Sequence, residues 1–417
     1  MSLNLTVHRG TQEIGGSCIE LATAQGERLL LDAGRPLDAP RDAKDLLPAT
    51  LDLSTGATVL FSHPHMDHWG LVEELPADWP IWTGSKSAEL MRLTQGLFGG
   101  SIDREICTWT SQTKQLQIGP FTVTPYLTDH SGMDAYMLLI EACGQRIFYT
   151  GDFRTHGRKA KLVENLIIAP PPDIDVLVTE GTNLRSTKPT VSETELEGAF
   201  VSLAAATERH VFVQWSAQNV DRTVTLFRAA RRTGRPLVID LYAADVLERV
   251  SAGTGIPVPG ERFPDLKVLI LGSGKRLYAR QKREDYVTRM ATSPFAVSRR
   301  SIAETPAIIM LRDSMLNEFE RGGLGFTPRD AYVFSSWSGY LDPQNEKSGW
   351  ARASAAGTNV EQIHTSGHAS PEDIARFAAA IAPKAIVPVH GLSWDDPGIL
   401  LPPLKRLQDG ESWKVGK

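Results

Sequence analysis

The chain has 417 residues, with 44 lysine and arginine residues against 49 aspartate and glutamate residues. A single core stops growing at roughly 250–300 residues, so this length favours two domains. A content of 41% hydrophobic and 22% charged residues excludes a mainly disordered chain. The net charge of −5 gives no overall electrostatic argument for a polyanionic partner.

The three cysteines, Cys18, Cys107 and Cys143, are too few and too widely spaced for a disulfide framework or a Cys-rich metal site. Free cysteines of this kind fit a reducing compartment. The N-terminal residues lack the charged and apolar segments of a signal peptide, and no apolar run approaches the ~18 residues of a membrane span. We therefore expect a cytoplasmic protein that does not enter a membrane.

The first third of the chain reads as short apolar strands separated by turns. Many strands with few helices predict a sheet-rich sandwich whose helices lie outside. The clearest early helix covers 85–93. The expected strands cover 3–8, 17–21, 28–32, 57–62, 121–127, 136–141, 146–150 and 175–179.

After Pro170, Pro171 and Pro172 the pattern changes to strands that alternate with helices, which predicts an open, largely parallel α/β sheet. Ser192 and Glu195 form a capping box at the first of these helices. The expected helices cover 192–207 and 220–233, and the strands cover 210–215, 236–241, 267–271 and 307–311.

The C-terminal tail contains a strand at 360–365, a helix at 371–381 and a strand at 385–389. Because this tail is too short for a separate domain, we expect it to complete the first one. The predicted organisation is a first domain at 1–185, an inserted domain at 186–345 and a return segment at 346–417.

Metal-type ligands gather in the segment His63-Pro64-His65-Met66-Asp67-His68, directly after a predicted strand. Histidines one residue apart can point the same way, and a turn brings Asp67 and His68 to a second position. Imidazole and carboxylate suit Zn²⁺, or Mn²⁺ where oxygen ligands are more numerous. A polar loop whose histidines cap a helix is the alternative, but four such ligands in six residues favour a metal site.

Further ligand candidates stand at the ends of other predicted strands. His130, Asp152 and His390 each lie next to a glycine or serine, where a side chain can reach a shared cleft. Each residue alone fits a structural role equally well. Together with the first segment, they complete two sets of metal ligands.

With these motifs, the chain resembles the metallo-β-lactamase-fold hydrolases and, within them, the β-CASP nucleases, over nearly its whole length. The segment 63–68 matches the first metal motif, His130 the next, and Gly151-Asp152-Phe153 the bridging-aspartate motif. The segments 12–18 and 31–34 resemble the opening strands of that fold. Glu180, His368 and His390 match the three β-CASP motifs.

This resemblance implies an α/β fold, in which a metallo-β-lactamase αββα sandwich carries an inserted α/β β-CASP domain. It also implies two divalent metal ions, with Zn²⁺ favoured and Mn²⁺ as the alternative. The implied ligands are His63, His65 and His130 for one ion, and Asp67, His68 and His390 for the second, with Asp152 as the bridge.

The resemblance implies three catalytic residues as well. Asp67 would orient the attacking water, besides binding a metal. His368 would stabilise the scissile phosphate or assist the leaving oxygen. Glu180 would orient a ligand or His368 through a hydrogen bond.

A histidine at the third β-CASP motif, together with the segment 365–373, resembles RNase J-type RNA-processing proteins. Ser366, Gly367 and Ser370 are candidate phosphate contacts near the helix that begins at Pro371, although Ser370 also fits a simple N-cap. Ser336, in a small-residue turn, is a further candidate contact against plain loop structure. Only 27 residues follow His390, whereas many RNase J-type proteins carry a further domain.

Counted by region, residues 185–345 carry 22 basic and 18 acidic residues, and the remainder carries 22 and 31. Basic runs such as 228–235 fit either solvated helix faces or a wall that guides RNA. We expect an RNA substrate in the cleft between the domains, and leave open whether the protein is a homodimer.

Three functions fit these observations. The first is a metal-dependent ribonuclease that cleaves phosphodiester bonds with a water activated by two metals. The second is a hydrolase of a small ester, lactone or phosphodiester, and the third is a noncatalytic RNA-binding member of the family. The filled ligand positions and the inserted domain with His368 favour the ribonuclease.

Overall fold

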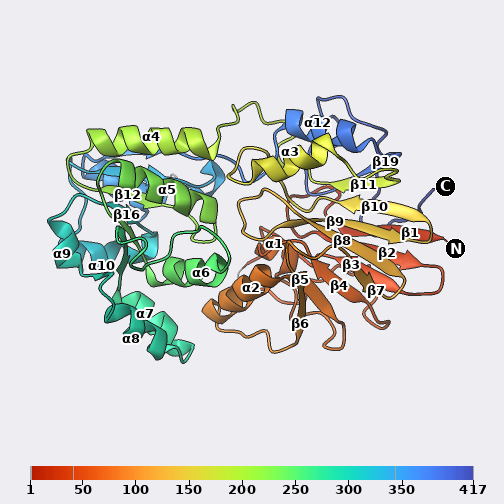
Figure 1. Ribbon diagram of the computed structural model, residues 1–417, viewed down its shortest axis with the longest axis horizontal. Helices are drawn as coiled ribbons and strands as arrows, with labels where there is room; N and C mark the ends of the chain where they lie inside the picture. Colours follow the sequence, from red (N-terminus) through yellow and green to blue (C-terminus); the bar gives the residue numbers. More distant parts are fainter. Residues whose placement is uncertain (1, 41, 343, 417) are drawn as a thin grey trace. The chain divides into compact units, whose positions relative to one another are not determined.

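The computed structural model describes residues 2–40, 42–342 and 344–416. The chain divides into two compact units, and Figure 1 labels many of their helices and strands. The first unit comprises Met1–Arg92, Ile102–Pro189 and Gly367–Lys417, and the second comprises Leu93–Ser101 and Thr190–Ser366.

Two sheets form the first unit, in the strand orders β20-β1-β2-β3-β4-β5-β6 and β19-β11-β10-β9-β8-β7. The strands of the first sheet are β1 (Leu3–Arg9), β2 (Cys18–Thr23), β3 (Arg28–Leu31), β4 (Thr58–Phe61), β5 (Ile81–Gly84), β6 (Ile106–Trp109) and β20 (Ser412–Lys414). Those of the second are β7 (Leu116–Ile118), β8 (Phe121–Leu127), β9 (Tyr136–Ala142), β10 (Gln145–Tyr149), β11 (Val176–Thr179) and β19 (Ala385–Pro388). The helices are α1 (Met66–Trp69), α2 (Ser85–Leu97), α3 (Ala160–Ile168) and α12 (Pro371–Ile381).

Alternation of apolar residues places the two faces of each strand in different layers. Leu29 and Leu31 of β3 join the core between the sheets, whereas Leu30 joins a separate core that includes residues of α2. In the other sheet, Leu138 lies in the core between the sheets, and Leu139 packs in a cluster with residues of α3 and α12, the helices drawn beside β11 and β19 in Figure 1. The first unit is therefore the predicted αββα sandwich.

The C-terminal segment completes both sheets of this sandwich. Strand β20 pairs antiparallel with β1, so that the two ends of the chain meet at one sheet edge (Figure 1). Strand β19 pairs in parallel with β11, which precedes the second unit in sequence. The larger part of the second unit, Thr190–Ser366, thus lies between β11 and β19 in the chain, and Leu93–Ser101 joins the unit from an earlier position.

The second unit contains one sheet in the order β15-β14-β13-β16-β12-β17-β18, and its strand pairs are all parallel. Its strands are β12 (Val211–Gln214), β13 (Leu237–Ile239), β14 (Leu266–Leu269), β15 (Ala296–Val297), β16 (Ile308–Met310), β17 (Ala331–Phe334) and β18 (Asn359–Gln362). Its α-helices are α4 (Glu193–Ala206), α5 (Val220–Arg232), α6 (Leu241–Ser251), α7 (Gly272–Arg280), α8 (Glu284–Ala291), α9 (Arg299–Ala303), α10 (Leu316–Arg321) and α11 (Gly349–Ala355). Two short 3₁₀-helices cover Asp313–Met315 and Ser338–Tyr340.

The elements expected from the sequence agree with these bounds to within three residues at either end, except α2, which extends to Leu97. The capping box is present at α4: Ser192 Oγ accepts from the Glu195 backbone N–H, and Glu195 accepts from the Ser192 backbone N–H. The three cysteines are free. In the described part of the chain, no helix has the length and apolar character needed to cross a membrane.

The boundary of the insertion differs from the predicted one. Strand β18, expected in the return segment 346–417, pairs with β17 and belongs to the second unit, so that the return begins at Gly367. Strand pairing decides this boundary, and a periodic pattern in sequence identifies a strand without identifying its neighbour.

Ion pairs within the second unit use many of its basic side chains. Arg228 and Arg232 both lie beside Glu197, Arg276 lies beside Glu318, and other pairs recur along the same helices. These pairs fit the interpretation of solvated helix faces. A wall that guides RNA stays a prediction.

Candidate metal centre

Five strands of the first unit end at one cluster of histidine and carboxylate side chains. His63 follows β4, His130 follows β8, Asp152 follows β10, Glu180 follows β11 and His390 follows β19. The cluster is completed by His65, by Asp67 and His68 of α1, and by His368, which precedes α12. The turn expected after His65 is the helix α1, which presents Asp67 and His68 on consecutive positions.

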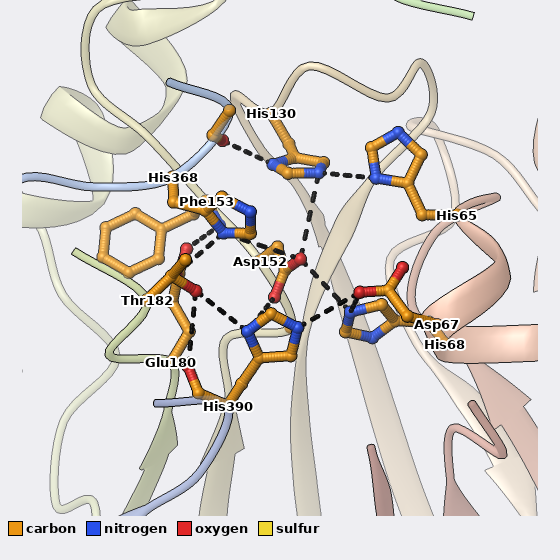
Figure 2. A network of polar contacts seen from close by, with 12 residues as sticks. His65, Asp67, His68, His130, Asp152, Phe153, Glu180, Thr182, His368 and His390 are labelled. Atoms are coloured by element: carbon orange, nitrogen blue, oxygen red, sulfur yellow. Dashed lines mark hydrogen bonds and ion pairs between the residues drawn. The ribbon is translucent and has the colours of Figure 1, made fainter. Parts of the chain in front are cut away.

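The ligand atoms form two groups around Asp152. His63, His65 and His130 offer nitrogens within 4.8 Å of one another, and Asp67, His68, Asp152 and His390 form a second such group. Asp152 Oδ2 lies 3.6 Å from His63 Nε2 and 3.2 Å from His68 Nε2, and Figure 2 shows the carboxylate among the rings. The seven predicted ligands therefore lie in one cluster, and a third group joins Asp152 and His390 to Glu180 and His368.

Neighbouring groups fix the orientation of the rings in the second ligand group. His68 Nδ1 lies 2.7 Å from Asp32 Oδ2, and His390 Nδ1 lies 2.9 Å from Thr182 Oγ1. These contacts leave Nε2 of each ring pointing to the carboxylates, with His390 Nε2 3.3 Å from Asp67 Oδ2. Holding one nitrogen in this way directs the other toward a metal.

The rings of the first ligand group are held in the same way. Ser62 Oγ lies 3.0 Å from His63 Nδ1, and the Gly367 carbonyl accepts from His130 Nδ1 at 2.6 Å. His130 Nε2 and His65 Nδ1 then approach to 3.0 Å. Two nitrogens that converge at this distance are arranged to share a cation.

Three buried atoms at the centre test whether the residues fit metal ions. His63 Nε2, His68 Nε2 and Asp152 Oδ1 have no hydrogen-bond partner within the described residues. An unsatisfied buried polar atom costs about 1–3 kcal/mol, and a cation in each ligand group would satisfy them. Imidazole nitrogen and carboxylate oxygen are donors that divalent metal ions accept. The residues fit such ions.

The electrostatics of the cluster favour the ligand forms of most of these side chains. Burial lowers the pKa of His63 and His130 well below its ordinary value, and neighbouring histidines lower it further. Burial raises the pKa of Asp152, but His390 and His68 outweigh it and hold this pKa well below its ordinary value. His68 is the exception: burial lowers its pKa, yet Asp152 and Asp32 raise it well above its ordinary value. Metal binding would therefore release a proton from His68.

His368 and Glu180 form a pair beside the ligands. His368 Nδ1 lies 2.9 Å from Glu180 Oε2, and the other Glu180 oxygen accepts from the Phe153 backbone N–H at 2.9 Å. Burial lowers the pKa of His368, but the carboxylates of Glu180 and Asp152 outweigh it and raise this pKa to about 9. Figure 2 shows the pair next to Asp152. Bound cations would oppose the protonation of His368.

Asp32 is a functional residue that the sequence analysis assigned only to an opening strand. It is fully buried in the left-handed region, with φ of 61°. Besides the contact with His68, its oxygens accept from the Ser62 backbone N–H at 2.7 Å, from Ser62 Oγ at 2.8 Å and from the Tyr149 hydroxyl at 2.6 Å. The signal for this role is the acidic residue directly after a buried strand, in Leu31-Asp32-Ala33-Gly34.

The predicted phosphate contacts have separate locations. The Gly367 carbonyl contacts His130 of the metal centre. A Cβ at position 367 would lie 2.6 Å from Ser131 Oγ. Ser370 caps α12 by accepting from the Asp373 backbone N–H, which confirms the capping alternative. Ser336 and Ser366 belong to the second unit. Phosphate binding by these four residues stays a prediction.

Comparisons with known proteins match two parts of the chain. Residues 13–186 match the Metallo-beta-lactamase superfamily, and residues 357–393 match the Zn-dependent metallo-hydrolase RNA specificity domain. These matches support the predicted resemblance to metallo-β-lactamase-fold hydrolases of the β-CASP, RNase J-like type.

Curated relatives resemble the chain over much of its length. Ribonuclease J of Helicobacter pylori is 23% identical over 436 residues, which cover 94% of this chain and 56% of that protein. Ribonuclease J of Thermus thermophilus is 24% identical over 368 residues, covering 80% and 57%. The chain thus spans just over half the length of these relatives. A solved structure of a protein of unknown function from Enterococcus faecalis has the same fold, with a TM-score of 0.80 and 20% identity over the whole of both chains.

Proposed function

We propose that this chain is a metal-dependent ribonuclease that hydrolyses phosphodiester bonds of RNA. The observation that carries the proposal is the two adjacent ligand groups, one of which contains Asp152, with three buried atoms that have no hydrogen-bond partner within the described residues. The match of residues 357–393 to an RNA specificity domain, and relatives named Ribonuclease J, support RNA as the substrate.

The proposed ligands are those of the two groups. One ion would be held by His63, His65 and His130, and the other by Asp67, His68 and His390, with Asp152 between them. The predominance of imidazole favours Zn²⁺, with Mn²⁺ as the alternative. Two such ions would lower the pKa of a water held between them and neutralise charge on the phosphoryl oxygens.

The protein residues would orient the reacting groups. Asp67 lies 3.3 Å from His390 and 3.9 Å from His68, so its carboxylate stands at the centre where an attacking water must be oriented. His368 Nδ1 is engaged by Glu180, and we propose that the protonated ring donates a proton to the leaving oxygen as the P–O bond breaks. Glu180 is a positioning residue in this scheme, because it acts through His368.

The test uses 5′-monophosphorylated, 5′-triphosphorylated and internally labelled RNA, with Zn²⁺ or Mn²⁺ and after chelation. Native protein should cleave RNA only with metal, and Asp67→Ala should abolish cleavage while the protein stays folded. The matched control is Asp52→Ala, which removes an exposed carboxylate of the same unit. Full cleavage by metal-free protein would overturn the mechanism, and hydrolysis of small esters without RNA cleavage would favour the second function.

A further inference from the structure

Two aromatic rings stand exposed on a short turn of the second unit. Trp337 is 57% exposed and Tyr340 is 69% exposed, and their ring centroids lie 5.3 Å apart in an edge-to-face arrangement at 89°. Exposed large apolar side chains of the first unit are aliphatic, whereas those of the second are aromatic. The aliphatic ones are Leu37, Leu53, Ile168, Leu392 and Leu400, and the aromatic ones are Phe98, Trp337 and Tyr340. Exposed Trp and Tyr rings are typical of binding surfaces.

The turn lies where open parallel sheets bind ligands. The chain runs from β12 to β13, β14 and β15 on one side, then places β16 and β17 on either side of β12. The strand order therefore reverses at β12, and ligands of such sheets bind beyond the carboxyl ends of the strands at this reversal. Strand β17 pairs with β12 and ends at Phe334, three residues before Trp337.

The segment that matches the RNA specificity domain anchors this turn. Strand β18 pairs with β17, and Phe334 lies opposite Gln362. Gln362 Nε2 donates to the Ser336 carbonyl at 3.1 Å, and Ser335 Oγ donates to the Ile363 carbonyl at 2.6 Å. Both Gln362 and Ile363 lie within the matched residues 357–393. The contact with this segment indicates RNA as the occupant.

Gly339 allows the Trp337 ring to fold back over the turn. A Cβ at position 339 would lie 2.3 Å from carbon atoms of that ring, so a side chain there would displace the ring. The tryptophan ring lies with one edge toward Gly339 and packs against Tyr340, and a large part of its surface is open to solvent. A ring that is already packed against its own turn loses less conformational freedom when a ligand stacks on it.

We propose that Trp337 and Tyr340 form a stacking platform for the bases of single-stranded RNA. This inference rests on the proposed function and adds a subsite to it. Every base has a π-face, so stacking on such rings tolerates sequence differences. In a duplex those faces are already stacked on neighbouring base pairs, so the platform selects single strands.

The experiment measures equilibrium binding of a fluorescent, cleavage-resistant phosphorothioate RNA to the full, metal-loaded chain. The probes are a single strand, the same strand as a duplex, and a strand of equal length without bases. The variants are Trp337→Ala, Tyr340→Ala, Trp337→Phe and Gly339→Ala, which keeps both rings but displaces one. The control is Ile168→Ala, which removes an exposed apolar side chain of α3 in the first unit. Circular dichroism confirms that each variant is folded.

Loss of one stacking ring should weaken binding of the single strand roughly 5- to 150-fold. Gly339→Ala should weaken it in the same direction, and Trp337→Phe should retain most of the affinity. Binding of the strand without bases should be equal in native protein and Trp337→Ala. Ile168→Ala should bind like native protein.

Three results would overturn the platform. If native protein binds single-stranded RNA and both alanine variants bind it equally well, the platform is wrong while the proposed ribonuclease function stands. If native protein neither binds nor cleaves RNA, the platform falls together with that function. If Trp337→Ala changes the molecular mass in solution but not RNA affinity, the rings belong to an interface between copies of the chain.

Discussion

Replacement of Asp32 by asparagine should weaken metal binding, although Asp32 is not itself a proposed metal ligand. The carboxylate is fully buried, and Oδ2 alone faces His68 Nδ1, the Tyr149 hydroxyl and Ser62 Oγ. An amide offers a single acceptor oxygen, so its NH₂ group would meet either these three donors or the Ser62 backbone N–H, which donates to Oδ1. In both placements a donor at the side chain that holds His68 is opposed by the NH₂ group, and disturbance of such an outer partner typically costs 10- to 100-fold in metal affinity.

Asp32→Ala should have a larger effect on folding. Four donor groups would lose their acceptor, since Oδ1 also accepts from the Ser62 backbone N–H. At about 1 kcal/mol for each buried donor, the lower end of the usual range, the free energy of unfolding should fall by roughly 4 kcal/mol. The asparagine variant separates the two effects, because it conserves volume and retains one acceptor.

Metal affinity is measured by Co²⁺ absorption titration and by the metal content after dialysis, and stability by urea unfolding of the metal-free proteins. Asp52→Asn is the control, since that carboxylate accepts from Ser54 and Thr55 on the surface. If Asp32→Asn binds two ions with native affinity, Asp32 does not position His68, and the reasoning fails.

Three further predictions concern single side chains. His368→Ala should lower kcat for RNA about 10²- to 10⁴-fold and leave the metal content unchanged. Single-turnover kinetics and elemental analysis measure these two quantities. Loss of a metal ion in this variant would instead indicate that His368 is a ligand together with Asp152, Glu180 and His390. Burial, assisted by Arg209 and opposed by Asp330, lowers the pKa of His210 from 6.5 to about 4. As the pH falls, the unfolded chain therefore takes up the proton before the folded one, and the free energy of unfolding should fall by about 3 kcal/mol between pH 6.5 and 4. Urea unfolding of His210→Phe should lack this pH dependence. Arg222→Ala should destabilise the second unit by about 3–5 kcal/mol, because it leaves the buried Glu193 carboxylate without its partner at 3.1 Å; retention of native urea stability would contradict this.

The metal ligands could be predicted from the sequence more fully than the residues that hold those ligands in place. His63, His65 and His68 follow one strand within six residues, and the chemistry of that segment is readable without coordinates. Their outer partners come from Asp32, Ser62, Thr182 and the Gly367 carbonyl, at sequence separations of up to 237 residues. Such contacts depend on which strands are neighbours. Backbone carbonyls carry no sequence signal at all.

The limits of the insertion were harder to predict for a related reason. Val360 has the same local pattern whether β18 adds to the first sheet or extends the second unit, and only the pairing of Val360 with Tyr332 decides. The exposed rings of Trp337 and Tyr340 raise the same difficulty, since a tryptophan in sequence is as often a core residue as a surface one. Burial, rather than residue type, distinguishes the two.

The chain order of the ligands links metal binding to closure of the first unit. His63 to Asp152 precede the long segment Thr190–Ser366 of the second unit, whereas His390 and the Gly367 carbonyl that holds His130 follow it. The centre is therefore incomplete until β19 has paired with β11 across the long intervening segment. Cations that bind only the completed centre stabilise this pairing by mass action. The same ions that would activate water thus favour the closed sandwich, and their loss should loosen the return segment before the second unit, whose sheet contains none of the seven ligands.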